Sequence, residues 1–421
     1  MIGYLRLLIS FGLVAGSPAY ASEAAPTLQF ENGLWFNGSS FEPRTVFSDK
    51  GRLSFSPPES VSRVIDLSGY RVIPPLCEAH NHNLGGEESE IGIINKYLQA
   101  GIYYVNLLSN LPYYTGQSLT KFNRPDSVDV QFANGGITSP DAHPIPLRER
   151  LLGYGAYPGF TKEMLADHAY FAVASTEDIE TKWPIILSYR PDFIKIFLLY
   201  SEKYDANNQS IYQEIVPGLD PALVPVLVEK AHAHDLRVFA HVETALDFHV
   251  AVAAGVDVIA HLPGDSVVAR IDPIDAHLAA ENDVIVITTA NLATRHAKNP
   301  ALYSEIRAAQ VHNLSLLRDA DVTLAIGSDQ YNADSRLEIE YLQGLGVFTP
   351  SELLNMWTRN CAVSIFPDRA IGTLDENAEA SFLVLDGNPL DDWTALNRIK
   401  LRIKDGRILE LADTDGTSEL Q

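Results

Sequence analysis

The sequence contains few cysteines, with only Cys77 and Cys361 among 421 residues. Two cysteines cannot build the dense disulfide framework of a small secreted scaffold, so the fold must depend on a hydrophobic core. Cys77 directly follows an apolar run, and Cys361 lies within a predicted helix, Pro350 to Ile365. Two buried free thiols are the favoured interpretation, and a single bridge between them stays open.

Basic residues are also scarce. Lysine and arginine together number 31 against 54 aspartate and glutamate residues, which gives a formal net charge of −23. A surface of this charge repels phosphate backbones, so nucleic acid is excluded as an expected partner. A small molecule or a short peptide remains the expected substrate, and no pattern indicates an oligomeric state.

Long apolar runs are missing after the N-terminus, so we expect no membrane span. Residues 1–21 read as a secretory signal peptide, with Arg6 as the positive region and Leu7 to Val14 as a short apolar core. Ala19-Tyr20-Ala21 fits the small-residue pattern of a cleavage site. The sequence therefore predicts an exported protein, either periplasmic or secreted.

Both ends of the remaining chain alternate short strand-like runs with turn signals such as Asn32-Gly33 and Asp405-Gly406. Neither end is large enough to be stable alone, because a few short strands need a partner to bury their apolar face. We therefore predict one small β-sandwich built from residues 27–74 together with residues 372–411. The polar tail, residues 412–421, is predicted to be disordered.

The middle of the chain, residues 75–371, alternates apolar strands with helical segments. Continuous apolar strands separated by helices are typical of a parallel sheet that is covered on both faces. Eight such strands predict an α/β fold of the (β/α)8 TIM-barrel class. The predicted strands are Val72–Leu76, Gly101–Leu108, Val128–Ala133, Phe193–Leu199, Arg237–Val242, Val256–Ala260, Asp283–Thr288 and Val322–Ile326.

Polar residues stand at the C-terminal ends of several of these strands, where TIM barrels place their functional groups. His80 and His82 share one side of an extended chain, because side chains two residues apart point the same way. Four imidazoles, one amine and one carboxylate thus converge on one rim and predict a metal site. The candidate ligands are His80, His82, Lys195, His241, His261 and Asp329.

Lys195 is the unusual member of this set, because it lies in the middle of the run Phe193-Ile-Lys-Ile-Phe197. Burying an unpaired ammonium group costs several kcal/mol. An edge strand with an outward-pointing side chain, or a buried ion pair, would avoid this cost. Carboxylation of the amine by CO2 is the chemical alternative, since the resulting carbamate is an anion that can bridge two cations.

Two divalent ions fit this donor set, because their charge is largely balanced by a carbamate, Asp329 and a hydroxide. Bound metals lower the pKa of water from about 16 towards about 7, which makes hydroxide available at neutral pH. Asp329 is then the predicted catalytic acid–base group, which takes a proton from the hydroxide and delivers it to the leaving amine. Zinc is the expected metal, although Mn, Fe and Co also suit these ligands.

The motifs His80-Asn-His82, DFIKIF around Lys195, AHVETALDFHVAVAAGVDVIAHLPG from His241, and IGSDQ with Asp329 resemble the amidohydrolase superfamily. The segment before His261 is most similar to its imidazolonepropionase-like and Xaa-Pro dipeptidase-like branch. The resemblance implies a binuclear zinc-type site with a carboxylated lysine. The chain departs from that branch in having Glu78 where an aspartate is usual.

We therefore expect a dipeptidase-like hydrolase that cleaves an amide or peptide-like C–N bond with metal-activated hydroxide. An esterase or lactonase on the same site is one alternative. A mononuclear deaminase or cyclic-amidine hydrolase is another, but its usual glutamate, three residues after the fifth-strand histidine, is replaced here by Thr244. A catalytically dead exported binding protein is disfavoured because all six groups are intact. His143, Tyr200 and Arg336 are candidate substrate contacts in loops.

Overall fold

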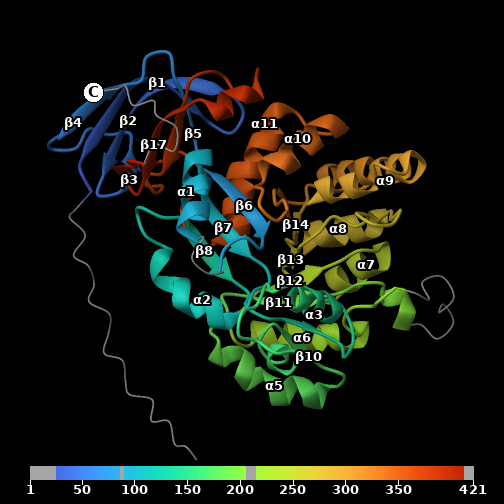
Figure 1. The fold of residues 1–421 in the computed structure, drawn as a ribbon. Helices are drawn as coiled ribbons and strands as arrows, with labels where there is room; N and C mark the ends of the chain where they lie inside the picture. Colours follow the sequence, from blue (N-terminus) through green and yellow to red (C-terminus); the bar gives the residue numbers. More distant parts are fainter. Residues whose placement is uncertain (1–24, 86–89, 205–214, 412–421) are drawn as a thin grey trace, which may run out of the picture.

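The computed structural model describes residues 25–85, 90–204 and 215–411, which form a sheet domain and a barrel (Figure 1). The predicted signal peptide, residues 1–21, and the predicted disordered tail, residues 412–421, lie outside the described residues. Among the described helices, none has the length and hydrophobicity that crossing a bilayer requires.

The sheet domain contains strands from both ends of the chain, as the sequence predicts. Its eight strands follow the order β18-β17-β16-β5-β1-β2-β3, with β4 paired to β1. Antiparallel pairing of Val72 with Val384 joins the N-terminal and C-terminal segments. The strands are β1 (Leu28–Phe36), β2 (Phe41–Asp49), β3 (Arg52–Ser54), β4 (Arg63–Asp66), β5 (Arg71–Ile73), β16 (Phe382–Leu385), β17 (Ile399–Lys404) and β18 (Arg407–Ile408).

The barrel consists of two parallel sheets that adjoin each other. One has the order β6-β7-β8 and the other β10-β9-β11-β12-β13-β14-β15. A backbone hydrogen bond of 3.0 Å from Ala79 to Ile326 connects the first barrel strand to the chain just after β15. The predicted (β/α)8 class is confirmed. The strands are β6 (Leu76–Asn81), β7 (Ile102–Leu107), β8 (Asp129–Phe132), β9 (Gly136–Thr138), β10 (Tyr170–Ala172), β11 (Ile194–Phe197), β12 (Val238–His241), β13 (Val258–Ile259), β14 (Ile285–Ile287) and β15 (Leu324–Ala325).

The first predicted barrel strand, Val72–Leu76, is wrong. Pro74 and Pro75 interrupt this run, because proline has no N–H to donate to a strand ladder. The residues before them belong to β5 of the sheet domain, and the barrel strand β6 starts only at Leu76. His80 therefore lies inside a buried strand rather than after it. The short strands β9 and β10 were not predicted.

Helices cover the outside of the barrel (Figure 1). Asp220 caps the turn that leads into α6, since its side chain accepts a 2.9 Å hydrogen bond from the Ala222 N–H. The described helices are α1 (Glu90–Ala100), α2 (Pro112–Ser118), α3 (Ile145–Gly153), α4 (Lys162–Leu165), α5 (Thr176–Ser188), α6 (Val224–His232), α7 (Ala245–Ala253), α8 (Pro273–Glu281), α9 (Pro300–Asp319), α10 (Arg336–Leu345), α11 (Pro350–Asn355) and α12 (Cys361–Ile365). Cys77 and Cys361 are both buried free thiols.

A buried ion cluster ties the sheet domain to the barrel. Asp129, the first residue of β8, accepts a 2.8 Å hydrogen bond from Lys404 of β17. Its other carboxylate oxygen lies 2.9 Å from Arg369, which also pairs with Glu379 at 2.6 Å. The Lys404 side chain is completely buried and depends on Asp129 for most of its charge compensation, because the other contacts are the Arg124 carbonyl and a longer 3.6 Å approach to Asp405.

We expect Asp129→Ala to lower the free energy of unfolding by about 3–5 kcal/mol, because it leaves the buried Lys404 ammonium without its main counter-ion. The measurement is urea unfolding followed by circular dichroism. Asp126→Ala is the matched control: Asp126 pairs with Arg124 at 2.8 Å, but both side chains are more than half exposed. Its expected cost is below about 1 kcal/mol. Equal losses in the two variants would contradict the cluster's role.

Candidate metal centre and active site

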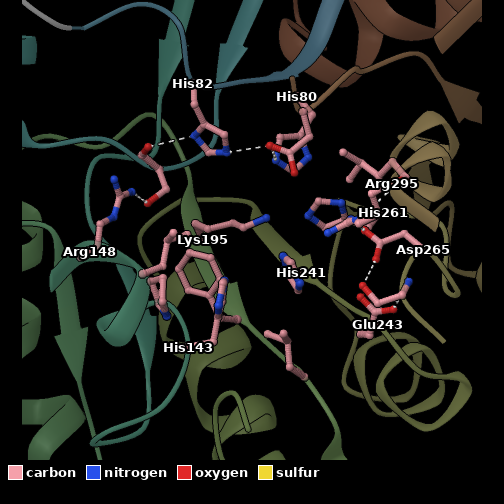
Figure 2. A pocket seen from close by; sticks show the side chains of 18 of the residues that line it. His80, His82, His143, Arg148, Lys195, His241, Glu243, His261, Asp265 and Arg295 are labelled. Atoms are coloured by element: carbon pink, nitrogen blue, oxygen red, sulfur yellow. Dashed lines mark hydrogen bonds and ion pairs between the residues drawn. The ribbon is translucent and has the colours of Figure 1, made fainter. Parts of the chain in front are cut away.

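His80 and His82, at the end of the first barrel strand, both direct Nε2 into the barrel mouth. His80 Nδ1 lies 2.7 Å from the Ala260 carbonyl, and His82 Nδ1 lies 3.0 Å from the Ser109 carbonyl. A carbonyl oxygen only accepts, so each Nδ1 carries a proton, which leaves Nε2 as the nitrogen that a metal ion would bind in the neutral ring. Both Nε2 atoms face Asp329, at 3.5 Å and 3.1 Å from Oδ1 (Figure 2). This is the tautomer that a metal ligand requires.

Two further histidines come from the ends of β12 and β13. The rings of His241 and His261 are 4.1 Å apart between centroids, and His261 is 4.4 Å from His80. His261 Nδ1 is held by the Thr289 hydroxyl at 2.9 Å. Burial lowers the pKa of His80 to about 3 and the pKa values of His241 and His261 well below the usual range. These imidazoles are therefore neutral, which is the form that binds metals.

Asp329 reaches this cluster through a tight turn after β15. Its N–H donates a 2.9 Å hydrogen bond to the His80 carbonyl. A Cβ at Gly327 would lie 2.7 Å from both N and Cβ of His80, so only glycine permits this approach. Burial raises the pKa of the Asp329 carboxyl, but the neighbouring His80, the hydrogen bond from His82 and the nearby Lys195 outweigh burial and lower the pKa overall. The carboxylate is thus ionised.

Glu78 supports this turn. Its two oxygens accept hydrogen bonds from the Ser328 N–H at 2.8 Å and the Ser328 hydroxyl at 2.9 Å. Burial raises the pKa of Glu78 well above its usual range. Glu78, which stands where the resembled branch usually has an aspartate, thus holds the residue before Asp329. The longer side chain reaches across from β6 to the opposite turn.

Lys195 is buried in the middle of β11, which pairs with β12 on one side and β9 on the other. Only 2 % of the residue is exposed, and its Nζ has no hydrogen-bond partner among the described residues. Burial lowers the pKa of its amine to about 7, although the charge of Asp329 opposes this shift. The strand position excludes an edge strand and an outward-pointing side chain. Lys195 forms no ion pair within the described part of the chain, which excludes the buried ion pair considered for it above.

All six predicted ligands line one cavity of about 330 Å³ at the barrel mouth. The carboxylate of Asp329 and ring nitrogens of His80 and His261 lie within 4.8 Å of one another, which is a spacing that fits one metal ion. The donor set therefore fits a metal: neutral imidazoles with fixed tautomers, an ionised carboxylate, and a buried amine lacking a partner.

The comparisons with known proteins agree with this geometry. Residues 206–409, which include His241, His261 and Asp329, match the amidohydrolase family. A crystal structure of an amidohydrolase superposes with a TM-score of 0.72 at 20 % identity, covering 92 % of this chain and all of the other. Residues 206–409 thus belong to the amidohydrolase family that the sequence motifs resemble. The protein is therefore a metal-dependent hydrolase, and the predicted class, which acts on carbon–nitrogen bonds, is confirmed at the level of the family.

Two other crystal structures share the fold of this amidohydrolase. A. niger ochratoxinase matches with a TM-score of 0.72 at 17 % identity, over 92 % of this chain and 96 % of that chain. A Xaa-Pro dipeptidase with bound methionine matches with a TM-score of 0.68 at 18 % identity, over 91 % of this chain and all of that chain. No curated protein matches the sequence.

The three predicted substrate contacts of the amidohydrolase have different positions. His143 and Tyr200 both line the cavity, and the His143 ring lies 5.4 Å from that of His241. Burial lowers the pKa of His143 to about 4. Arg336 instead begins α10 and borders a separate depression with Lys96. It is not among the residues that line the metal-site cavity.

Sequence reasoning missed several residues that line the cavity of this amidohydrolase. Asp265 follows His261 in the same loop and forms a 2.7 Å ion pair with Arg295 (Figure 2). Glu243 accepts a 2.8 Å hydrogen bond from the Ser266 N–H, and its pKa is raised by burial and by the charge of Asp265. Their position in loops after barrel strands was the available signal. Arg148, which had no such signal, is considered further below.

Proposed function

We propose that this amidohydrolase holds two divalent metal ions, of the zinc type by their ligands, and cleaves the amide bond of dipeptide-like substrates. The observation that carries this proposal is the Lys195 amine, which is buried without a partner among the described residues. Figure 2 shows it pointing into the space between His80, His82, His241 and His261.

Carboxylation of Lys195 resolves the cost of its burial. The neutral amine nitrogen forms a bond to the carbon of CO2 and releases one proton, which leaves a carbamate anion. A single ammonium in this position has neutral imidazoles and one aspartate around it, whereas a carbamate would offer two oxygens to the metal ions that these residues would hold. The proposed bridge therefore uses the atom that the rest of the fold leaves unpaired.

Divalent ions held by these residues would polarise a substrate carbonyl and lower the pKa of water. The chain's own groups supply the remaining chemistry. Asp329 is ionised and can accept a proton from the attacking water, then donate it to the leaving nitrogen. His143 and Tyr200 line the same cavity and position the substrate. The buried apolar side chains of Phe197 and Leu199 line the same cavity and strengthen these electrostatic interactions by lowering the local polarity.

A dipeptide-like substrate is favoured over the deaminase alternative by the residues after β12. The position three residues after His241 is Thr244, whose hydroxyl caps α7 by accepting a 3.1 Å hydrogen bond from the Asp247 N–H. The Glu243 carboxylate, two residues after His241, accepts a hydrogen bond from the Ser266 N–H. A Xaa-Pro dipeptidase and a prolidase complexed with N-methylphosphonate-L-proline share this fold, which supports a peptide-like substrate. We also propose export, on the pattern of residues 1–21.

We expect elemental analysis of protein purified without chelator to find about two divalent ions per chain, because four imidazoles, one carboxylate and the proposed carbamate exceed the four ligands that one zinc ion takes. Removing the metals with a chelator should abolish hydrolysis of dipeptides and N-acyl amino acids, and added zinc should restore it. A firm value of one ion per chain would contradict the binuclear proposal. A panel that also contains esters and lactones, and on which only these are cleaved, would contradict the amide proposal.

A further inference from the structure

A second cavity of about 370 Å³ adjoins the metal-site cavity. The two share four lining residues: His82, Ser109, Arg148 and Tyr331. The second cavity is otherwise mainly apolar and aromatic, since Leu111 and Tyr157 belong to a small hydrophobic cluster of their own. This cavity, which we call the side chamber, is thus an apolar space that opens beside a metal ligand.

Arg148 lies at the junction between the two cavities and has no acidic partner among the described residues. Only 7 % of the residue is exposed. One terminal nitrogen donates a 2.7 Å hydrogen bond to the Tyr157 hydroxyl, and the other donates to the Ser109 hydroxyl. Both acceptors are neutral, and Nε is buried without a partner. Arginine stays charged in proteins, so a full positive charge is buried here uncompensated.

The position of this charge is fixed relative to the metal ligands. The Ser109 carbonyl accepts the hydrogen bond from His82, and the Ser109 hydroxyl accepts the one from Arg148 (Figure 2). One residue therefore connects the guanidinium to a candidate metal ligand. The other arginine that lines the metal-site cavity, Arg295, is already paired with Asp265 at 2.7 Å. Of these two arginines of the metal-site cavity, Arg148 is the one that has no acidic partner among the described residues.

We propose that the side chamber and Arg148 form the subsite for the leaving half of the substrate, an amino acid with a free carboxylate and an apolar side chain. This inference rests on the proposed amide hydrolysis. In an N-acyl amino acid the carboxylate is attached to the carbon next to the scissile nitrogen, so it lies a few ångströms from the reacting carbonyl. Arg148 still has its Nε–H and one N–H on each terminal nitrogen to offer as a planar fork, which matches a carboxylate.

The chamber and the charge select different parts of this fragment. The carboxylate binds at the junction, while the apolar side chain fills the space lined by Leu111, Leu151 and Tyr157. Amino acids with small or charged side chains leave this space poorly filled. The subsite therefore predicts a preference for large apolar C-terminal residues with a free carboxylate over the corresponding amides.

The test measures binding to the metal-loaded full chain by calorimetry, so that it does not depend on activity. The probes are 3-phenylpropanoate and the neutral 3-phenylpropan-1-ol, which share the apolar part. We expect the wild type to bind the carboxylate at least about tenfold more tightly, since a charge-assisted hydrogen bond contributes about 1.5–3 kcal/mol. Arg148→Met should weaken carboxylate binding by about 10- to 100-fold and leave the alcohol unchanged.

Arg150→Met is the matched control, because Arg150 lies on the same helix, is exposed, and does not line either cavity. Leu151→Trp fills the side chamber and should weaken both phenyl probes while sparing propanoate. If Arg148→Met does not fold, Arg148→Lys replaces it, with an expected loss of at least about threefold because lysine offers no fork. Carboxylate preference that persists in the Arg148 variant, for example through direct binding to the metals, overturns the proposal.

These outcomes are separable from the proposed function. If the protein cleaves no amide yet loses carboxylate preference in Arg148→Met, the subsite stands and the amide proposal fails. The opposite outcome is also possible. If the wild type and Arg148→Met both cleave N-acyl amino acids as well as they cleave the same compounds with a C-terminal carboxamide, the amide proposal stands and the subsite fails. For cleaved substrates with a free carboxylate, Arg148→Met should raise KM more than it lowers kcat.

Discussion

Replacing Lys195 by methionine is expected to reduce kcat/KM by about 10²–10⁴-fold, the range for losing a group that positions charge at a reaction centre. Methionine has a similar length and suits the apolar walls around β11, so the fold should be retained. The variant removes the one nitrogen that can carry the proposed carbamate. We therefore expect at least one of the two metal ions to be lost as well, which elemental analysis of the purified variant measures.

Lys195→Ala extends this test, because it leaves space for an added molecule. A short carboxylic acid such as propionate should restore part of the activity and the metal content by supplying the two oxygens in trans. In the wild type, growth with labelled bicarbonate should give a carbamate carbon signal in the NMR spectrum. Lys230→Met is the control, since Lys230 pairs with Glu180 on the outer surface. Full activity in both Lys195 variants would remove the bridge from the mechanism.

The ligand set could be predicted from the sequence because strand geometry is local and periodic. Side chains of a strand alternate, and parallel strands end at one rim, so polar residues at strand ends must converge. His241 and His261 follow this rule, and the structure brings their rings to 4.1 Å. Lys195 was recognisable for the same reason, since an amine within an apolar strand contradicts the pattern of a core.

The first barrel strand could not be placed because its apolar run belongs to two sheets. Val72 pairs with Val384, more than 300 residues away, whereas Leu76 pairs with Ile102. The residues before and after the two prolines are similarly apolar, so composition does not show where one sheet ends and the other begins. The long-range pairing decides which sheet each residue joins. Only Pro74 and Pro75 carried a local signal, and a proline pair at the edge of a run is easily read as part of a turn.

Loop residues were predicted least well, because their positions depend on packing that no periodicity encodes. Arg336 follows the same turn as Asp329, yet its helix directs it to the outside of the barrel. Arg148 is the fourth residue of α3, shortly after Pro144 and Pro146, and Ser109 and Tyr157 hold its guanidinium at the cavity. A single sequence contains no pattern that separates these two arginines.

Asp329→Asn is expected to lower kcat by about 10²–10⁴-fold with a smaller change in KM, because the amide can neither accept nor return the proton that the reaction moves. Asparagine is the appropriate replacement, since residue 329 has a positive φ of 48° and asparagine tolerates this left-handed conformation better than alanine does. Steady-state kinetics on a cleaved dipeptide give the two parameters, and elemental analysis shows whether metal is retained.

Glu78→Gln is the matched control for this change. It makes the same acid-to-amide change at a buried residue that holds Ser328, the neighbour of Asp329 in the chain. Glu78 itself does not line the cavity. We expect a loss below about tenfold, because the amide oxygen can still accept a hydrogen bond from Ser328. If Asp329→Asn keeps its metals and loses no more activity than Glu78→Gln, the proton is transferred elsewhere, and Asp329 acts only as a ligand. Retained metals with a large fall in kcat would instead assign the proton transfer to this carboxylate.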